Sequence, residues 1–492
     1  MIDMPLPDLI EIVPLDQPVR AEITVPGSKS ITNRALILAA LADGPVTLKG
    51  ALWSEDTQIM VDCLKELGFV VHVTPEPDEP CNRTIMVVGG GGRVPPGGTE
   101  SEPLDLFVGN AGTAARFLAP FLCLGSGVYR LHGVPRMHER PQAALFQALR
   151  ELGYRVEAEH ENEKLPVRIF SADVLRPPES QTEFIQRKQV PPVPQQCHVS
   201  ITESSQFASA LLLSAEVGGW NVEIEGENAE ESPYVVMTSK LMEVFPKKGG
   251  TFQIEPDASS GSYFWAAGWL VFSNLTWDFM HKVVPMVDVL KKLGQEAFKN
   301  ELQKMHAQES RVKVAMWPES QWQIDADFTI FIHSGLGAIP IEISRTHDLG
   351  DSIMTAIVLA PLNDRMVKFT DLGRLRVQEC ERVVALRTEL TKCGAKVVEE
   401  GDTLTVYPSK PEQLHGAEIE TYNDHRMAMC SAILGLKVPG IRIKNPACVK
   451  KTFPNFFQKL AAAPPHGLGA EIWEIKNGQR TRKLSGADLF AD

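Results

Sequence analysis

The sequence predicts an α/β (α+β) protein of two similar domains, each built from three repeated βα units. Its 492 residues exceed the length that one hydrophobic core normally serves, so at least two domains are expected. A unit of apolar helix, Gly- or Pro-marked turn, strand, polar connector and amphipathic helix also recurs six times along the chain. Because such self-similarity is typical of duplicated architectures, we expect three units in each half.

The six copies follow one another in chain order. Each opens with an apolar run of helical length, continues with a strand-like segment, and closes with a helix ending at Leu-Gly or an equivalent. The copies are residues 35–68, 117–153, 207–245, 263–294, 353–394 and 427–460, of which the fourth and fifth are the faintest. The alternative is an α/β chain without duplication, since alternating helices and strands always look somewhat self-similar.

Composition excludes several classes of protein. The net charge of −13 argues against nonspecific binding to nucleic acid or to an acidic membrane surface. The eight cysteines include no C-x-x-C pair, so neither a zinc framework nor a secreted disulfide scaffold is expected. The apolar runs at 117–124 and 263–272 are too short to span a bilayer, and the first residues have no basic region. We therefore expect a cytoplasmic protein with reduced thiols.

The segment Pro26-Gly27-Ser28-Lys29-Ser30-Ile31-Thr32-Asn33-Arg34 concentrates cations, hydroxyls and an amide directly before an apolar run. The run predicts a buried helix at 35–41, which places the polar residues at its N-terminus. Free backbone N–H groups and the positive end of the helix dipole meet there, so the segment is a candidate anion site. The alternative is an ordinary cap, in which Ser30 or Thr32 closes the helix and the two cations are solvated.

Similar polar groups precede the first helix of four other copies. They are Gly109-Asn110-Ala111-Gly112-Thr113, Ser204-Ser205-Gln206, Asp348-Leu349-Gly350-Asp351-Ser352 and Asn423-Asp424-His425-Arg426. Asn, Asp and Ser are usual caps, but capping does not explain Arg34, Arg116 and Arg426 in the first turns, where a cation opposes the dipole. Bound anions would explain them. The glycine spacings match neither G-x-G-x-x-G nor a P-loop, so no nucleotide site is predicted.

Further cations lie on the connectors: Arg136, Arg140, Arg382, Lys450 and Lys451. For each of these alone, a solvated surface charge is the alternative. His138, His347 and His425 have no metal-ligand spacing, so we predict no metal site.

Six strings together resemble the 5-enolpyruvylshikimate-3-phosphate synthase family, the 3-phosphoshikimate 1-carboxyvinyltransferases. They are Pro-Gly-Ser-Lys-Ser, Gly-Asn-Ala-Gly-Thr, Arg-Met-x-Glu-Arg-Pro, Ser-Ser-Gln-Phe, Tyr-Asn-Asp-His-Arg-Met-Ala and Lys-Thr-Phe-Pro, in the family's order over residues 24–460. The resemblance implies an inside-out α/β barrel in each of two domains. Domain I would comprise residues 1–27 and 256–492 and domain II residues 28–255, with the active site in the cleft between them.

The resemblance also implies the reaction and the roles of individual residues. The enolpyruvyl group of phosphoenolpyruvate would pass to the 5-hydroxyl of shikimate 3-phosphate, with Asp351 as proton acceptor, Glu379 as proton donor and Lys29 contacting both substrates. Shikimate 3-phosphate would be held by Lys29, Ser30, Arg34, Ser204, Ser205, Gln206, Asp351 and Gln378. Phosphoenolpyruvate would be held by Lys29, Gly112, Arg140, Gln206, Arg382, Arg426 and Lys451.

Elementary chemistry agrees with these assignments. The two substrates together carry roughly five to six negative charges, because each phosphate contributes about −1.5 to −2. The cations named above could offset them, and arginine is suited to binding a carboxylate through both of its parallel N–H groups. Proton transfer and charge stabilisation require an acid, a base and cations, so we expect neither a cofactor nor a metal.

Four departures and two rival interpretations stand beside the resemblance. Gln378 replaces the family's usual lysine, so slower turnover is expected; Glu231-Ser232-Pro233-Tyr234 is shifted, which leaves the role of Ser232 open. Residues 273–335 match poorly, and the tail after about 462 has no counterpart.

The rivals are a UDP-N-acetylglucosamine enolpyruvyl transferase, disfavoured by the Glu-Arg-Pro and Asp-His-Arg-Met contexts, and a weak homologue that only binds anions or a partner.

Overall fold

The computed structural model describes residues 6–16, 19–171, 195–226, 232–272, 312–334 and 342–491. The chain divides into two compact units, each considered by itself below. Unit 1 comprises Met1–Pro26 and Pro256–Asp492, and unit 2 comprises Gly27–Glu255. The fourth predicted copy (263–294) and the poorly matching stretch 273–335 lie largely outside the described residues.

The described residues of unit 2 form three sheets, with strand orders β12-β3-β5-β4, β6-β7-β9-β8 and β10-β11. Its strands are β3 (Pro45–Leu52), β4 (Val71–Pro75), β5 (Asn82–Val88), β6 (Leu104–Phe107), β7 (Val128–His132), β8 (Arg155–Ala158), β9 (Val167–Phe170), β10 (Gln195–Ser200), β11 (Trp220–Glu225) and β12 (Gly250–Gln253). Its helices are α1 (Lys29–Leu41), α2 (Glu55–Glu66), α3 (Gly112–Cys123), η1 (Met137–Glu139), α4 (Ala143–Glu151), α6 (Ser205–Gly218) and α7 (Pro233–Val244).

The part of unit 1 that the structure describes also forms three sheets, with orders β13-β2, β14-β15-β17-β16 and β18-β19-β1-β20-β21. Its strands are β1 (Leu9–Ile12), β2 (Ala21–Ile23), β13 (Val312–Val314), β14 (Glu342–Ser344), β15 (Val367–Thr370), β16 (Val397–Glu400), β17 (Thr403–Val406), β18 (Glu418–Ile419), β19 (Ile441–Lys444), β20 (Ile472–Lys476) and β21 (Gln479–Leu484).

The helical segments of unit 1 alternate with these strands. They are α8 (Ala258–Phe272), η4 (Ile324–Asp327), α11 (Phe328–Ser334), α12 (Ile353–Leu359), η5 (Ala360–Leu362), η6 (Leu372–Val377), α13 (Arg382–Lys392), η7 (Pro411–Gln413), α14 (His425–Gly435), η8 (Pro446–Lys451), α15 (Phe456–Ala461) and η9 (Gly486–Leu489). None of the helices in the described ranges is long and apolar enough to cross a bilayer.

One sheet pattern recurs in both units, which confirms the predicted repetition of βα units. Each of the six sheets in the described ranges contains one parallel strand pair: β12/β3, β6/β7, β10/β11, β2/β13, β14/β15 and β18/β19. In four of these pairs a helix connects the two parallel strands, namely α3, α6, α12 or α14. In the other two pairs the strands are distant in the chain: β3 and β12 come from the two ends of unit 2, and β2 and β13 come from the two chain segments that form unit 1.

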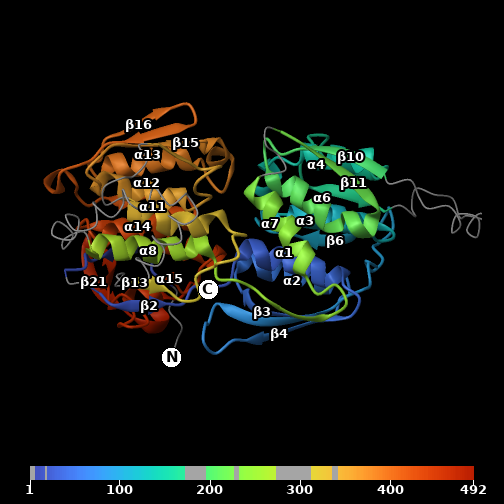
Figure 1. Cartoon of the computed structure of the whole chain (residues 1–492), viewed down its shortest axis with the longest axis horizontal. Helices are drawn as coiled ribbons and strands as arrows, with labels where there is room; N and C mark the ends of the chain where they lie inside the picture. Colours follow the sequence, from blue (N-terminus) through green and yellow to red (C-terminus); the bar gives the residue numbers. More distant parts are fainter. Residues whose placement is uncertain are drawn as a thin grey trace, which may run out of the picture. The chain divides into compact units, whose positions relative to one another are not determined.

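The connecting helices lie inside their units and the strands lie outside them (Figure 1). Every residue of α3 and α14 is buried, as is α1 from Ile31 to Leu41. A helix that is apolar on all sides must be enclosed, because no face of it can meet water without cost. The fold is therefore an α/β barrel turned inside out in each unit, as predicted.

The residues after about 462, for which the family resemblance offers no counterpart, add two strands to unit 1. Strand β1 pairs antiparallel with β19 on one side and with β20 on the other. Glu11 in β1 is buried and accepts hydrogen bonds from Arg442 in β19 and from Arg480 in β21. The tail is thus an integral part of this sheet.

Candidate active site

Arg34 lies at the meeting point of helices α1, α3 and α6 in unit 2. Helix α1 begins at Lys29, earlier than predicted, so Arg34 falls in its second turn and is 1% exposed. Its guanidinium donates to the hydroxyls of Thr238 (2.7 Å) and Ser209 (3.0 Å), and it lies 5.1 Å from the centroid of the Phe117 ring. Burial lowers the pKa of Arg34 to about 10, so it keeps its charge at neutral pH. A full positive charge is therefore enclosed by neutral groups.

Lys29 and Ser30 form the first turn of α1. The Lys29 Nζ atom lies 3.1 Å from Oδ2 of Asp56 in α2, and the lysine side chain is 18% exposed. The Ser30 carbonyl accepts a hydrogen bond of 2.9 Å from Arg34. Neither Ser30 nor Thr32 is the cap, because Ser28 occupies that position without a side-chain cap bond. The hydroxyl of Ser30 is therefore not used to close the helix.

Arg140 lies directly against the start of helix α3. A Cβ atom on Gly112 would come within 2.6–2.7 Å of the Arg140 guanidinium, so only glycine allows this approach. Arg140 donates to the Asn110 carbonyl at 3.2 Å and is 8% exposed. Within the described ranges, no carboxylate lies within ion-pair distance of Arg140. The structure thus brings together Gly112 and Arg140, which the resemblance assigns to one substrate.

Gln206 links the starts of α3 and α6. Its side-chain oxygen accepts a 2.7 Å hydrogen bond from Arg116, and its side-chain nitrogen donates to the Thr113 hydroxyl at 3.3 Å. Ser204 is the N-cap of α6, where its hydroxyl accepts the Gln206 backbone N–H, and Ser205 is buried beside it. Unit 2 therefore places all its predicted site residues around the starts of three helices.

Asp351 is the centre of the charged cluster in unit 1. Its carboxylate lies 2.7 Å from Arg345 and 3.1 Å from Arg426, and its side chain is 14% exposed. Burial opposes its charge, but the guanidinium groups of Arg426, Arg345 and Arg382 outweigh burial and hold the pKa of Asp351 well below its ordinary value. Arg345 was missed in the sequence, where its only signal is its position six residues before Asp351.

A second group of charges surrounds Arg382, which is 1% exposed. Its guanidinium pairs with Asp424 (2.7 Å) and Glu379 (2.7 Å) and donates to the Gln378 amide oxygen. Lys451 pairs with the other oxygen of Glu379 at 3.1 Å. Burial disfavours the charge of Arg382, but Asp424, Glu379 and Asp351 prevail and raise its pKa above the ordinary value. Asp424 lies in the Tyr-Asn-Asp-His-Arg-Met-Ala string, but no role was predicted for it from the sequence.

Helix α8 supplies partners that sequence reasoning also missed. Arg426 donates to the Ser259 hydroxyl at 3.1 Å and to the Tyr263 hydroxyl at 3.5 Å. Burial raises the pKa of Tyr263 well above its ordinary value, so the phenol stays neutral. Both residues follow Pro256-Asp257, a polar start to an apolar helix like the other motifs. Unit 1 therefore gathers Asp351, Gln378, Glu379, Arg382, Arg426 and Lys451 through a continuous set of contacts.

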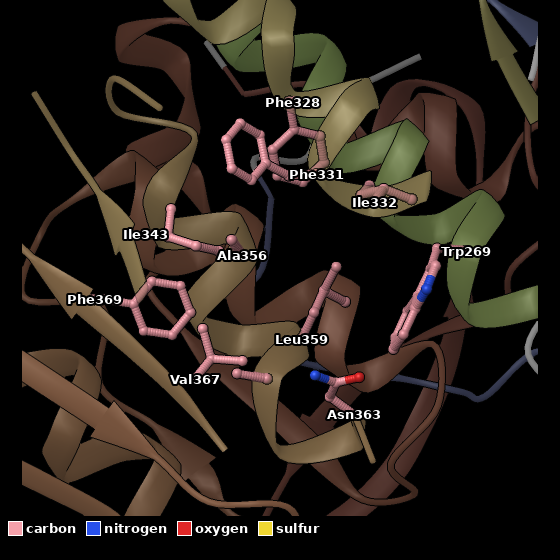
Figure 2. Close-up of a pocket in the computed structure, with 11 residues that line it drawn as sticks. Trp269, Phe328, Phe331, Ile332, Ile343, Ala356, Leu359, Asn363, Val367 and Phe369 are labelled. Atoms are coloured by element: carbon pink, nitrogen blue, oxygen red, sulfur yellow. The ribbon is translucent and has the colours of Figure 1, made fainter. Parts of the chain in front are cut away.

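The apolar pocket of unit 1 does not fit a phosphate-bearing substrate (Figure 2). It is lined by Trp269, Phe328, Phe331, Ile332, Ile343, Ala356, Leu359, Ala360, Asn363, Val367 and Phe369. Asn363 and the Trp269 indole are its only polar side chains, and it contains no cation. Among the described residues, no group of three or more His, Cys, Asp or Glu side chains could hold a metal ion.

Two comparisons of sequence connect the chain with known proteins. The family model described as EPSP synthase (3-phosphoshikimate 1-carboxyvinyltransferase) matches residues 15–248 and 245–460. A 3-phosphoshikimate 1-carboxyvinyltransferase of Trichormus variabilis is 34% identical over 478 residues, covering 92% of this chain and 98% of the relative. The enzyme of the same name from Opitutus terrae is 36% identical over 485 residues, covering 93% and 98%.

Solved structures share the fold. EPSP synthase from Acinetobacter baumannii has a TM-score of 0.64 at 18% identity and covers 94% of this chain and 99% of its own. The enolpyruvyl transferase NikO from Streptomyces tendae has a TM-score of 0.60 at 13% identity and covers 95% and 99%. At these identities the likeness establishes the architecture alone.

Proposed function

The chain belongs to the EPSP synthase family, and on that premise we propose how its residues carry out the reaction. Its activity is the transfer of the enolpyruvyl group of phosphoenolpyruvate to the 5-hydroxyl of shikimate 3-phosphate, with release of phosphate, in aromatic amino-acid biosynthesis. The observation that carries this conclusion is the match of the family model to both halves of the chain, supported by relatives about one-third identical over nine-tenths of its length.

The test is a phosphate-release assay with the purified chain. We expect inorganic phosphate to appear only when both substrates are present, together with one equivalent of the enolpyruvyl product by mass spectrometry. Measurable binding of shikimate 3-phosphate without any phosphate release would instead favour a binding protein. Replacing shikimate 3-phosphate by UDP-N-acetylglucosamine should give no release.

We propose that the active site lies in the cleft between the two units, which serve as domains I and II. Shikimate 3-phosphate would contact Lys29, Ser30, Arg34, Ser204, Ser205, Gln206, Asp351 and Gln378. Phosphoenolpyruvate would contact Lys29, Gly112, Arg140, Gln206, Arg382, Arg426 and Lys451. Arg34 already uses most of its five N–H groups within unit 2, so it would act through its remaining N–H and its charge.

The carboxylates of unit 1 would have two roles. Without substrate they neutralise the buried cations. Leaving such a cation without its partner would cost about 3–5 kcal/mol of stability. When the anionic substrate takes over Arg426 and Arg382, Asp351 loses part of the stabilisation that holds its pKa low and becomes a better base. Asp351 would then accept the proton of the attacking hydroxyl.

Glu379 would act as the acid that protonates the methylene carbon of phosphoenolpyruvate, and the methyl group so formed would give a proton back when phosphate leaves, which restores the double bond of the enolpyruvyl product. Each of its oxygens now pairs with a cation, Arg382 or Lys451. A carboxyl group must carry a proton to donate one, so the substrate anion has to occupy these cations first. Proton donation would therefore be coupled to substrate binding, which protects the site from unproductive transfer.

The surroundings of the reaction are also proposals. The net charge of −13 and the eight free cysteines support a cytoplasmic protein with no nucleic-acid or membrane partner. The reaction as written needs no metal and no redox cofactor. Full activity in the presence of a chelator would support this.

A further inference from the structure

Side chains in and directly before the short helix η4 hydrogen-bond to the N-terminal ends of helices α8 and α12, which adjoin the candidate site. The side-chain oxygen of Gln323, directly before η4, accepts the backbone N–H of Ala258, the first residue of α8, at 3.0 Å. Its side-chain nitrogen donates to the Pro256 carbonyl at 2.9 Å. Asp325 in η4 accepts the backbone N–H of Ser352, the N-cap residue of α12, at 2.6 Å. Two residues separated by one position, Gln323 and Asp325, thus bind both helix starts.

These two helix starts hold Arg426 from both sides. Helix α8 supplies the hydroxyls of Ser259 and Tyr263, and the turn before α12 supplies the carboxylate of Asp351. A displacement of η4 would therefore shift both Asp351, the proposed base, and the cation Arg426. No residue of η4 was predicted as part of the site, because this region matches the family poorly.

The approach of Asp325 to the turn is unusually close. A Cβ atom on Gly350 would lie 2.8 Å from Oδ2 of Asp325 and 2.8 Å from a side-chain carbon of Ile324. Gly350 is thus a position where only glycine admits the neighbouring segment. Asp325 is itself 6% exposed, so its carboxylate is committed to this contact.

The charged form of Asp325 is energetically unfavourable in its buried position. Burial and the neighbouring Asp351 raise its pKa above the ordinary value, against the attraction of Arg426 and the bond from Ser352. An apolar residue would avoid this cost but could not accept the Ser352 N–H, which would then be buried without a partner.

We propose that Asp325 is a positioning residue for the reaction: by accepting the Ser352 N–H, it fixes the turn that holds Asp351 between Arg345 and Arg426. This inference rests on the proposed role of Asp351 as base. A displacement of about 1 Å in such a group can cost roughly a hundredfold in rate, so the effect belongs in kcat.

The experiment compares three variants of the full chain with the wild type. Asp325→Ala removes the acceptor, and we expect kcat to fall by about tenfold to a hundredfold while KM for both substrates changes by less than about threefold. Asp325→Asn keeps an acceptor of the same size and should recover most of kcat. Glu319→Gln, an exposed carboxylate before η4, is the matched control and should behave as wild type.

A fourth variant, Gly350→Ala, keeps the inference testable should Asp325→Ala unfold. Gly350→Ala leaves Asp325 in the sequence but forces it away from the turn, and it should reproduce the loss of kcat. Two results would overturn the inference. One is a fall in both kcat and substrate affinity in Asp325→Ala that Asp325→Asn does not rescue; the other is wild-type kcat in Asp325→Ala. Asp351→Asn separates the two proposals: wild-type activity there would refute the role of the base, whatever Asp325 variants do.

Discussion

The arginines of the candidate site are stabilised by different means in the two units, whereas Lys29 of unit 2 pairs with a carboxylate, that of Asp56. In unit 2, Arg34 is surrounded by hydroxyls, backbone carbonyls and an aromatic ring, and Arg140 contacts a backbone carbonyl. In the described part of unit 2, neither guanidinium lies within ion-pair distance of a carboxylate. In unit 1, by contrast, Arg345, Arg382, Arg426 and Lys451 each pair with Asp351, Glu379 or Asp424.

This difference suggests a division of labour. Positive charge that neutral dipoles hold in place can bind an anion without first losing a partner, so Arg34 and Arg140 of unit 2 are suited to substrate binding. Charge that carboxylates neutralise can be released only in exchange for another anion, and the exchange changes the basicity of those carboxylates. Unit 1 is therefore suited to proton transfer.

Removing Asp351, the proposed base, should have the largest effect. We expect Asp351→Ala to lower kcat by about 10³-fold, because a positioned base contributes about 10² to 10⁴. Steady-state phosphate release measures this. The matched control is Asp364→Asn, an exposed aspartate of the same unit, which should retain wild-type kcat.

The stability of unit 1 should depend on pH through the same residue. The pKa of Asp351 is depressed in the folded chain, so its stabilisation is present above its unfolded pKa near 4 and is lost as pH falls toward the lower folded value. We expect Asp351→Asn to lower the free energy of unfolding by about 3 kcal/mol at pH 7. Urea unfolding should show this difference shrinking below about pH 4; a pH-independent difference would contradict the ion-pair account.

Unit 2 can be tested through the contact between Gly112 and Arg140. Because the added methyl group of Gly112→Ala would lie within 2.7 Å of the guanidinium, Arg140 must move. We expect KM for phosphoenolpyruvate to rise about tenfold, in line with one charged hydrogen bond of about 1.5–3 kcal/mol, with a smaller change in kcat. In an Arg140→Ala background the same substitution should add almost nothing, and additive effects would show that the clash is not the cause.

The smallest effect should come from adding a cation to unit 1. We expect Gln378→Lys to leave kcat unchanged or raise it by about threefold, a fraction of what a pre-organised charged group can supply. A large loss, measured by the same phosphate assay, would instead mean that the hydrogen bond that Arg382 donates to the Gln378 amide oxygen is needed more than the charge.

The sequence predicted the repeated βα architecture and most of the helix starts at the candidate site, because both depend on local patterns. The apolar runs that follow Gly112, Ser204 and Asp424 indicate buried helices with polar first turns. It misplaced the start of α1, and so put Arg34 in the first turn, because the polar residues hid a helix that is buried from Ile31 on.

The partners of the charged residues could not be predicted. Asp56 is 27 residues from Lys29, and Ser209 and Thr238 are 175 and 204 residues from Arg34, so only the packing of helices brings them together. Asp325 lies in a stretch whose pattern matched poorly, and its importance comes from a backbone N–H, which has no signature in sequence.

The added strands β20 and β21 make the ends of the chain interdependent. Strand β1 is bordered by β19 and β20, so a chain cut after residue 462 would expose one full edge of β1, with its amides and carbonyls unpaired. Such an edge accepts any suitable extended peptide. The shortened chain would thus have a vacancy that a second molecule, or a synthetic hairpin copied from residues 471–485, could fill.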